Sequence, residues 1–242
     1  MKILTWNLGL SWWCKYAHYF GLEIKGEKIK HEYFQKQHLE TIVAKIEEIN
    51  PTICILQEFY DEKDRLLMIS KLGKKYPYNS SLHAWYHQHT IMVFSLDKIK
   101  VEQLSETGFY VVKTDSFSLV PIHLHSFSAE KRLKQIKNLL FEIEKSREKI
   151  DCVLGDTNFW CFGKKPYFLF KKDKITYGFL INKFNDATKN INRTVKSFMN
   201  FDKIFLLKDM QFKNPTCIQN NEKYMDHFPV FVDLVMPESK MD

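Results

Sequence analysis

The sequence predicts an α/β fold in which helices pack on the faces of β-sheets. Two observations lead to this expectation. Segments with a helical spacing of apolar residues alternate along the chain with short apolar runs, and several of those runs end in polar residues. Continuous apolar runs are typical of strands buried on both faces, and their alternation with helices favours a layered arrangement. We expect one domain over residues 1–242, because no break rich in proline or glycine divides the chain.

The first part of the chain predicts a strand, a helix, a second strand and a second helix. Residues 2–8 are predicted as a strand rather than a signal peptide, because polar Thr5 and Asn7 interrupt the apolar run and no small-residue cleavage site follows. Residues 36–49 have helical periodicity, and Pro51 ends this helix because proline lacks the amide hydrogen. Residues 53–56 form a short buried strand, and 61–72 a second helix. The apolar positions of the first helix are Leu39, Ile42, Val43, Ile46 and Ile49.

The remainder of the chain predicts six strands and one strong helix. Strands are expected near 90–95, 108–113 and 117–124, and the helix over 129–147. A strand at 151–154 ends at Gly155 and Asp156, and further strands cover 202–207 and 228–234. The apolar face of the helix consists of Leu133, Ile136, Leu139, Leu140 and Ile143.

The composition is that of a globular protein. Apolar residues make up 45% of the chain and charged residues 27%, which excludes a disordered chain. No run approaches the roughly 18 apolar residues that a membrane span needs. The five cysteines are odd in number and form no Cys-x-x-Cys pair, which favours reduced thiols. We therefore expect an intracellular, cytoplasmic protein without a signal peptide or transmembrane segment.

Positive charge is concentrated in residues 159–208. This segment has eleven basic residues and three acidic ones, a net charge of +8, whereas the whole chain carries +7. Aromatic residues are interspersed with the lysines, a mixture suited to phosphate contacts and base stacking. We expect this segment to bind an anionic partner, with nucleic acid favoured and a membrane second, and we expect the chain to act as a monomer.

Polar residues follow the predicted strands at several points. In layered α/β folds ligands gather at the carboxyl ends of strands, and carboxylate and amide oxygens suit Mg²⁺. Asn7, Glu58 and Asp156 each end a predicted strand, while Asp202 begins one and Asp226 directly precedes one. The full set of such residues is Asn7, Glu58, His123, His125, Asp156, Asn158, Asp202, Asp226 and His227.

The order of these residues resembles the endonuclease/exonuclease/phosphatase superfamily, which includes deoxyribonucleases, apurinic endonucleases, neutral sphingomyelinases and inositol-polyphosphate 5-phosphatases. The resemblance implies a four-layer α/β sandwich, with two face-to-face mixed β-sheets flanked by helices. Two stretches resemble the type 2 tyrosyl-DNA phosphodiesterase branch. One is Gly155-Asp156-Thr157-Asn158, and the other is His123-Leu124 followed by Arg132-Leu133-Lys134-Gln135. The six matching segments are Thr5-Trp6-Asn7, Leu56-Gln57-Glu58, His123-Leu124, Gly155-Asp156-Thr157-Asn158, Phe201-Asp202-Lys203-Ile204-Phe205 and Asp226-His227-Phe228-Pro229-Val230.

The resemblance also implies a role for each residue. Glu58 would be the main ligand of Mg²⁺, or of Mn²⁺ in place of Mg²⁺. Asn7 would lie beside Glu58, and Asp226 would help to hold the metal. Asp156 would orient and deprotonate the attacking water. The phosphate would be contacted by Asn158, by His227 with its ring oriented by Asp202, and by a second histidine. For that second histidine we favour His123 over His125.

Together these features predict a Mg²⁺-dependent phosphodiester hydrolase acting on nucleic acid, of the nuclease or tyrosyl-DNA phosphodiesterase type. Water activated by the metal would attack the phosphate in line. One alternative is a lipid phosphodiesterase of the sphingomyelinase kind, since residues 9–34 are rich in tryptophan and tyrosine, which favour membrane interfaces. Another is a non-catalytic nucleic-acid-binding module, which the complete set of catalytic residue types disfavours.

Overall fold

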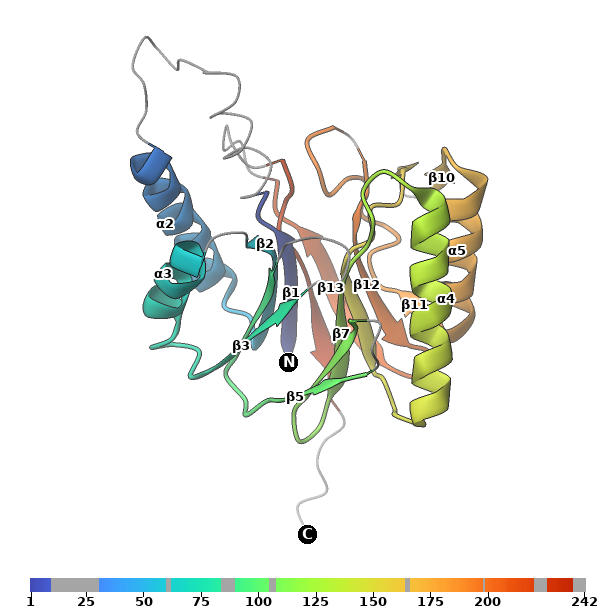
Figure 1. Cartoon of the computed structure of the whole chain (residues 1–242), viewed down its shortest axis with the longest axis horizontal. Coiled ribbons are helices and arrows are strands. Elements are labelled where there is room, and N and C mark those ends of the chain that lie inside the picture. Colours follow the sequence, from blue (N-terminus) through green and yellow to red (C-terminus); the bar gives the residue numbers. More distant parts are fainter. Residues whose placement is uncertain are drawn as a thin grey trace.

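Two six-stranded mixed β-sheets lie face to face, and helices cover the outer face of each (Figure 1). The computed structural model describes residues 1–9, 31–59, 62–83, 90–104, 108–163, 166–197, 199–219 and 226–236, with the backbone alone at 31–37. The four layers confirm the predicted α/β sandwich.

The first sheet has the strand order β13-β14-β1-β2-β4-β3. Strands β1 and β2 run parallel, and the other neighbours in this sheet are antiparallel. Its strands are β1 (Lys2–Asn7), β2 (Ile53–Phe59), β3 (Tyr78–His83), β4 (Thr90–Ser95), β13 (Gln211–Cys217) and β14 (Val230–Val235).

The second sheet has the order β11-β12-β8-β7-β6-β5, and its parallel pair is β7 with β8. A short hairpin of β9 (Cys161–Phe162) and β10 (Tyr167–Phe168) stands apart from both large sheets. The strands of the second sheet are β5 (Lys100–Gln103), β6 (Tyr110–Lys113), β7 (Ser118–His123), β8 (Cys152–Asp156), β11 (Phe184–Asp186) and β12 (Asp202–Leu207).

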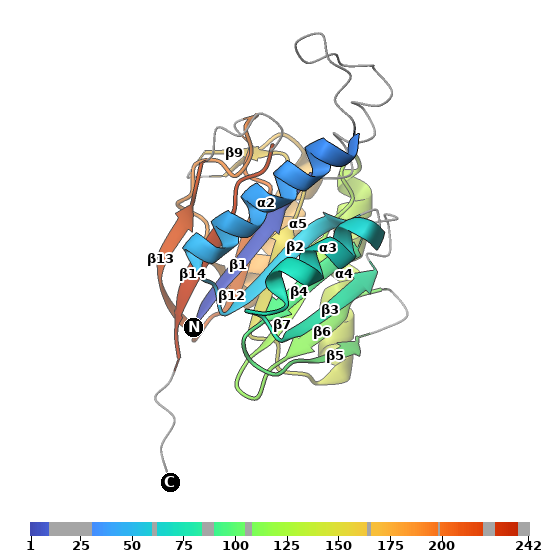
Figure 2. The same ribbon diagram turned by 90° about the vertical axis from the view of Figure 1, so that its left-hand side faces the viewer.

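Helices α2 (His31–Ile49) and α3 (Glu62–Leu72) cover the first sheet (Figure 2). Helices α4 (Ala129–Ser146) and α5 (Lys171–Lys183) cover the second. Helix α4 begins at Ser128, whose hydroxyl accepts a hydrogen bond from the backbone N–H of Lys131 at 3.3 Å. Such an N-cap satisfies a donor that the first helical turn leaves unpaired.

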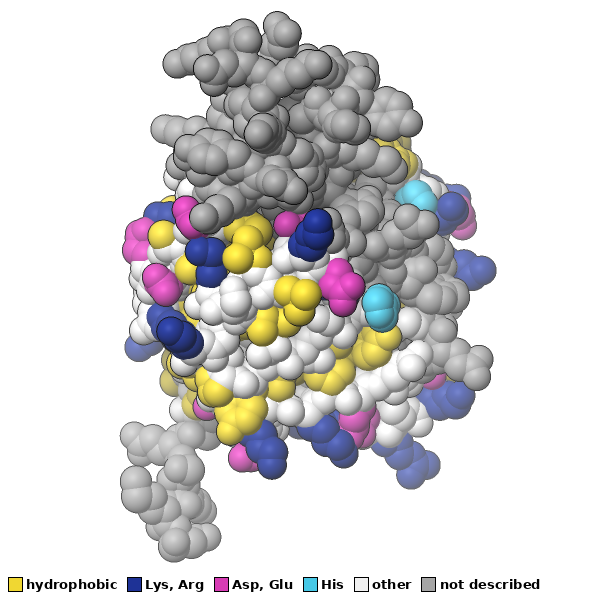
Figure 3. Space-filling model, turned by 60° about the vertical axis from the view of Figure 1, so that its left-hand side comes forward, with side chains coloured by type: hydrophobic (Ala, Val, Ile, Leu, Met, Phe, Trp, Pro, Cys, Tyr) yellow, Lys and Arg dark blue, Asp and Glu magenta, His cyan; other side chains and the backbone are white. Residues whose placement is uncertain are grey.

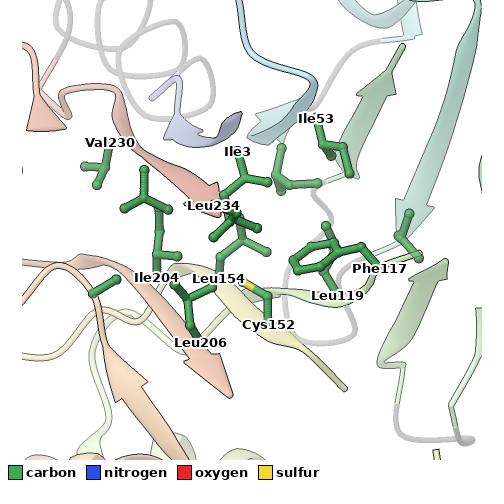
Figure 4. Packing of buried hydrophobic residues seen from close by; sticks show 14 of the residues in the cluster. Ile3, Ile53, Phe117, Leu119, Cys152, Leu154, Ile204, Leu206, Val230 and Leu234 are labelled. Carbon is green, nitrogen blue, oxygen red and sulfur yellow. The ribbon is translucent and has the colours of Figure 1, made fainter. Parts of the chain in front are cut away.

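The alternation of side chains along each strand builds separate apolar layers. In β1, Ile3 points into the space between the sheets, whereas Leu4 and Trp6 pack under α2 and α3. In the second sheet, Leu119, Leu154 and Ile204 meet the first sheet in the central layer (Figure 4). Burying each such side chain stabilises the fold by about 1.5–3 kcal/mol relative to leaving it exposed.

A β-bulge interrupts the alternation at the end of β2. The register between β2 and β4 shifts between Leu56 and Phe59, so both of these residues pack under the helices although they are three positions apart. The extra residue lets Gln57 and Glu58 turn to the side of the second sheet. Gln57 donates to the Thr5 hydroxyl at 2.8 Å, and Glu58 has a left-handed backbone with φ of 69°. Bulges of this kind are common beside active sites.

The basic segment 159–208 corrects one interpretation of the sequence. No helix or strand was predicted between residues 159 and 201, but the described part of this stretch contains β9, β10, α5 and β11. Helix α5 was not predicted, because its buried face includes polar Asp173 and Thr176 beside Leu180. Lys203 also departs from the expected surface charge, since it is fully buried with its Nζ 3.6 Å from Asp186 Oδ2.

On the face covered by α2 and α3, lysine and arginine side chains lie among acidic and apolar ones (Figure 3). Cys54, Cys152 and Cys161 are buried free thiols. Among the described residues, the helices do not combine the length and the apolar composition needed to cross a bilayer.

Gly155 and Gly178 provide a matched test of backbone packing. A Cβ at Gly155 would lie 1.9 Å from the Ile122 carbonyl oxygen, and its φ is +142°, whereas a Cβ at Gly178 in α5 meets nothing within 4 Å. We expect Gly155→Ala to lower the free energy of unfolding by about 3 kcal/mol or more. Gly178→Ala should raise it by about 0.5–1 kcal/mol, because alanine favours helix. Urea denaturation followed by circular dichroism measures both, and similar effects of the two changes would contradict the close approach of β7 to β8.

Candidate active site

Strand register brings three of the predicted site residues side by side on the second sheet. His123 of β7 pairs with Asp156 of β8, and Asp156 pairs in turn with Asp202 of β12. Register partners on adjacent strands point to the same face of a sheet, so these side chains lie together. Asp156 and Asp202 are almost fully buried, and His123 is buried beside them.

The first sheet contributes Asn7 and Glu58 from the opposite side of the same space. Asn7 ends β1, and Glu58 sits at the bulge of β2. The Asn7 amide Nδ2 donates to Glu58 Oε1 at 3.0 Å and to Asp156 Oδ2 at 2.8 Å. One buried amide therefore joins carboxylates from both sheets.

Glu58, His123 and Asp156 form a possible metal-binding triad. One ligand atom from each lies within 4.8 Å of the others. The Nε2 atom of His123 is 3.6 Å from both Glu58 Oε1 and Asp156 Oδ2, and the Glu58 side chain is 12% exposed. Two carboxylates held this close in a buried site favour a cation between them, and their oxygens are the ligands that hard divalent cations prefer.

Asn7 and Asp226, both predicted to help hold the metal, are arranged differently. The Asn7 Oδ1 atom accepts a hydrogen bond from the backbone N–H of Gly9 at 3.0 Å, so the amide nitrogen faces the carboxylates. Asn7 would present its oxygen to a cation after a 180° turn of the amide. Asp226 is half-buried and lies outside the triad, next to His227.

Asp156 is oriented by the residues that follow it. Its Oδ1 accepts a hydrogen bond from the backbone N–H of Asn158 at 2.7 Å, and its Oδ2 faces Asn7 and His123. Asn158 has a left-handed backbone with φ of 50°, and its side-chain Nδ2 donates to the Leu124 carbonyl at 2.9 Å. Left-handed backbone at a residue other than glycine is uncommon and often occurs at functional sites.

Asp202 and His227 form a buried pair. The Nδ1 atom of His227 lies 2.8 Å from Asp202 Oδ2, and its Nε2 lies 3.9 Å from Asp156 Oδ2. Burial raises the pKa of Asp202 to about 6, although the neighbouring His227 opposes this. Burial lowers the pKa of His227, but the carboxylates of Asp202 and Asp226 outweigh it and raise that pKa well above its ordinary value. The imidazolium form is therefore favoured, with Nδ1 donating to Asp202.

Sequence reasoning missed the residues that hold this pair in place. The Thr194 hydroxyl accepts from the backbone N–H groups of Phe201 and Asp202 at 2.9 and 3.0 Å. The Trp6 indole donates to the His227 carbonyl at 3.2 Å, and the rings of Phe201 and His227 lie 6.0 Å apart. Thr194 follows no periodic pattern, whereas Trp6 stands next to Asn7 in a matching segment.

The two candidate phosphate-contacting histidines have different surroundings. His123 lies in the triad, and burial lowers its pKa, opposed by the charge of Asp156. The Nδ1 atom of His125 instead accepts hydrogen bonds from the backbone N–H groups of Phe127 and Ser128, both at 3.2 Å. His125 thus supports the turn before α4, whereas the geometry places His123 in the triad with Glu58 and Asp156.

The structure therefore brings together Asn7, Glu58, His123, Asp156, Asn158, Asp202 and His227, with Asp226 adjoining. The aromatic side chains of residues 9–34, on which the lipid alternative was based, lie outside the described residues.

Comparisons with known proteins support the same fold. No family model matches the sequence, and no curated protein matches it. Solved structures do match, and many are endonuclease/exonuclease/phosphatase family proteins. One such protein from Bacteroides thetaiotaomicron has a TM-score of 0.67 and 14% identity, with 98% of each chain covered.

Two further solved structures are named for their activity. An AP endonuclease from Archaeoglobus fulgidus has a TM-score of 0.70 and 14% identity, covering 97% of this chain and 99% of its own. A truncated TDP2 from Caenorhabditis elegans has a TM-score of 0.63 and 15% identity, with 96% of each chain covered. The chain has the endonuclease/exonuclease/phosphatase fold, as the sequence motifs predicted.

The Asp202–His227 pair predicts a shift that NMR can measure. In Asp202→Asn the carboxylate that stabilises the imidazolium is gone, so the pKa of His227 should fall. The His227 ring signal, titrated in EDTA, reports this value. Asp209→Asn, a change in an exposed turn, is the matched control and should leave the titration unchanged. Equal pKa values for His227 in the wild type and Asp202→Asn would contradict the pairing.

Proposed function

We propose that this protein is a Mg²⁺-dependent phosphodiesterase that hydrolyses nucleic acid. The observation that carries the proposal is the meeting of Glu58, His123 and Asp156 from two sheets, with the Asp202–His227 pair beside them. An arrangement that contains a carboxylate base, a protonated imidazole and a cation site suits attack of water on an anionic phosphate.

Asp156 acts as the general base. Its two oxygens are fixed by Asn158 and Asn7, which holds the carboxylate in one orientation with Oδ2 toward His123. A positioned base of this kind contributes about 10²–10⁴-fold by taking a proton from water during the attack. Fixing the carboxylate in advance removes the cost of ordering it in the transition state.

His227 stabilises charge on the phosphate. With its pKa raised, the ring carries a proton on Nε2, which can be donated to a phosphate oxygen, while Asp202 holds Nδ1. His123 has a lowered pKa and is neutral near pH 7, so it contributes a hydrogen bond rather than a charge. The two histidines therefore act differently, because their surroundings move their pKa values apart.

The donor set fits a hard divalent cation. Glu58 would hold it, with Asn7 contributing after its amide turns, and Asp156 would face it as the base. When bound, Mg²⁺ would supply Lewis-acid stabilisation of the negative charge on the phosphate. His123 also faces this position, with its Nε2 3.6 Å from Glu58 Oε1.

The charge of segment 159–208 supports nucleic acid as the substrate. All three of its acidic residues, Asp173, Asp186 and Asp202, are buried. Lys171, Lys172 and Lys174 are exposed in the first turn of α5. The accessible charge of the described part of the segment is thus positive, as phosphate contacts require.

A substrate panel with Mg²⁺ tests the proposal. Single- and double-stranded DNA, 5′-phosphotyrosyl DNA, abasic DNA, RNA and sphingomyelin should be compared, and we expect turnover of at least one nucleic acid. Asp156→Asn should lower kcat by about 10²–10⁴-fold because the base is lost, while Asp209→Asn should leave it unchanged. Turnover of sphingomyelin alone would overturn the proposal.

Metal binding can be measured without activity. A ligand that binds only the folded state raises the melting temperature, so Mg²⁺ should stabilise the wild type after EDTA treatment. Glu58→Gln should lose most of this stabilisation. Glu62→Gln, an exposed change in the first turn of α3, is the control and should respond like the wild type. An undiminished response of Glu58→Gln to Mg²⁺ would remove Glu58 from the metal site.

A further inference from the structure

Three aromatic side chains form an accessible surface beside the candidate active site. Phe127 is 74% exposed in the turn before α4, Phe170 is 45% exposed at the start of α5, and Trp160 is half-buried. The ring centroids of Trp160 and Phe170 are 5.9 Å apart. The Trp160 indole donates to the carbonyl of Ser126, the neighbour of Phe127, at 3.4 Å. We call Phe127, Trp160 and Phe170 the aromatic platform.

The backbone under the aromatic platform is held by a buried ion pair. Arg132 of α4 makes a bidentate contact with Asp173 of α5 at 2.8 and 2.7 Å, and both side chains are fully buried. Arg132 Nη1 also donates to the carbonyls of His125 and Ser126 at 2.8 and 3.0 Å, just before Phe127.

Asp173 also contacts the backbone of the other two platform residues. Asp173 Oδ2 accepts from the backbone N–H of Trp160 at 3.1 Å, and the Asp173 N–H donates to the Phe170 carbonyl at 3.0 Å. Burying two charges has a large desolvation cost. The fold nevertheless keeps this ion pair beneath the three accessible rings, and the pair fixes the backbone positions of Phe127, Trp160 and Phe170. A patch that served only as apolar surface would not require such fixed positions.

The aromatic platform is continuous with the catalytic residues. The ring of Trp160 lies 6.3 Å from that of Phe201, which lies 6.0 Å from the ring of His227. Lys171 and Lys174 are exposed next to Phe170, while Lys172 pairs with Glu130. A nucleic-acid strand with one phosphate at His227 would contact aromatic rings and positive charge between His227 and the start of α5.

We propose that the aromatic platform stacks unpaired bases of a single-stranded nucleic acid next to the scissile phosphate. The inference rests on the proposed function and gives its substrate class. A base has a flat π-face, and stacking on an aromatic side chain contributes about 1–3 kcal/mol per base. Aromatic rings on a fixed backbone and flanked by lysines match this ligand, because the bases stack on the rings and the phosphates are attracted to the positive charge. A bilayer would need only exposed apolar area.

Binding of a fluorescein-labelled oligothymidylate, followed by anisotropy, tests the proposal. The Asp156→Asn background with Mg²⁺ keeps the probe from being cut. The double change Phe127→Ala and Phe170→Ala should raise Kd about tenfold or more. Phe141→Ala is the matched control, because Phe141 is 62% exposed elsewhere on α4, and it should change Kd by less than about twofold.

A second double variant separates stacking from apolar contact. Phe127→Leu and Phe170→Leu keep apolar area without aromatic rings, so they should weaken oligothymidylate binding nearly as much as alanine. Unchanged melting temperatures show that the variants are folded. The proposal is overturned if either double variant binds like the wild type, if Phe141→Ala is equally weakened, or if the rings affect only binding to phosphatidylcholine–sphingomyelin vesicles.

Failure of the proposal and failure of the proposed function are distinguishable. Wild-type turnover of the small diester bis(p-nitrophenyl) phosphate with Mg²⁺ reports the hydrolytic site alone. Turnover of this diester together with ring-independent oligothymidylate binding would reject the aromatic platform and keep the hydrolase. Ring-dependent binding without turnover of any phosphodiester would reject the hydrolase and keep the platform.

Discussion

The site depends on keeping two buried carboxylates from different sheets close together. Glu58 and Asp156 would repel one another in a region of low dielectric, and the Asn7 amide lies between them as a common donor. That amide is held in turn by the backbone of Gly9. Because the three residues come from β1, β2 and β8, the distance between the sheets and the geometry of the site are coupled. The central apolar layer is what sets that distance.

Much of the fold could be predicted from the sequence because its strands are apolar and its motifs stand at their ends. The strands around Asn7, Asp156 and Asp202 agree with the structure within a residue or two. Helix α5 could not be predicted, since Asp173 on its buried face looks like a solvent-exposed acid until its partner Arg132 is known. The bulge at Glu58 could not be predicted either, because it depends on a partner strand that is distant in the sequence. Strict alternation would turn this acid toward the helices, and the register shift appears only when β2 is paired with β4.

Residue type identified the chemical groups of the site but not their supports. Asp202 and His227 are 25 positions apart in the sequence, and only their match to the family motifs predicted that their side chains are in contact. Thr194, which fixes the backbone of Asp202, stands in a segment without periodicity. The choice between His123 and His125 also needed coordinates. His123 ends β7 and His125 comes two residues later, and only the hydrogen bonds to the His125 ring separate a turn-forming role from a position in the triad.

The burial of every acidic side chain of segment 159–208 has an electrostatic consequence. Asp173, Asp186 and Asp202 are held inside the protein, so in the described part of that segment the charged side chains that contact solvent are lysines and an arginine. Dissolved salt should therefore control how far the positive potential of this segment reaches into solution.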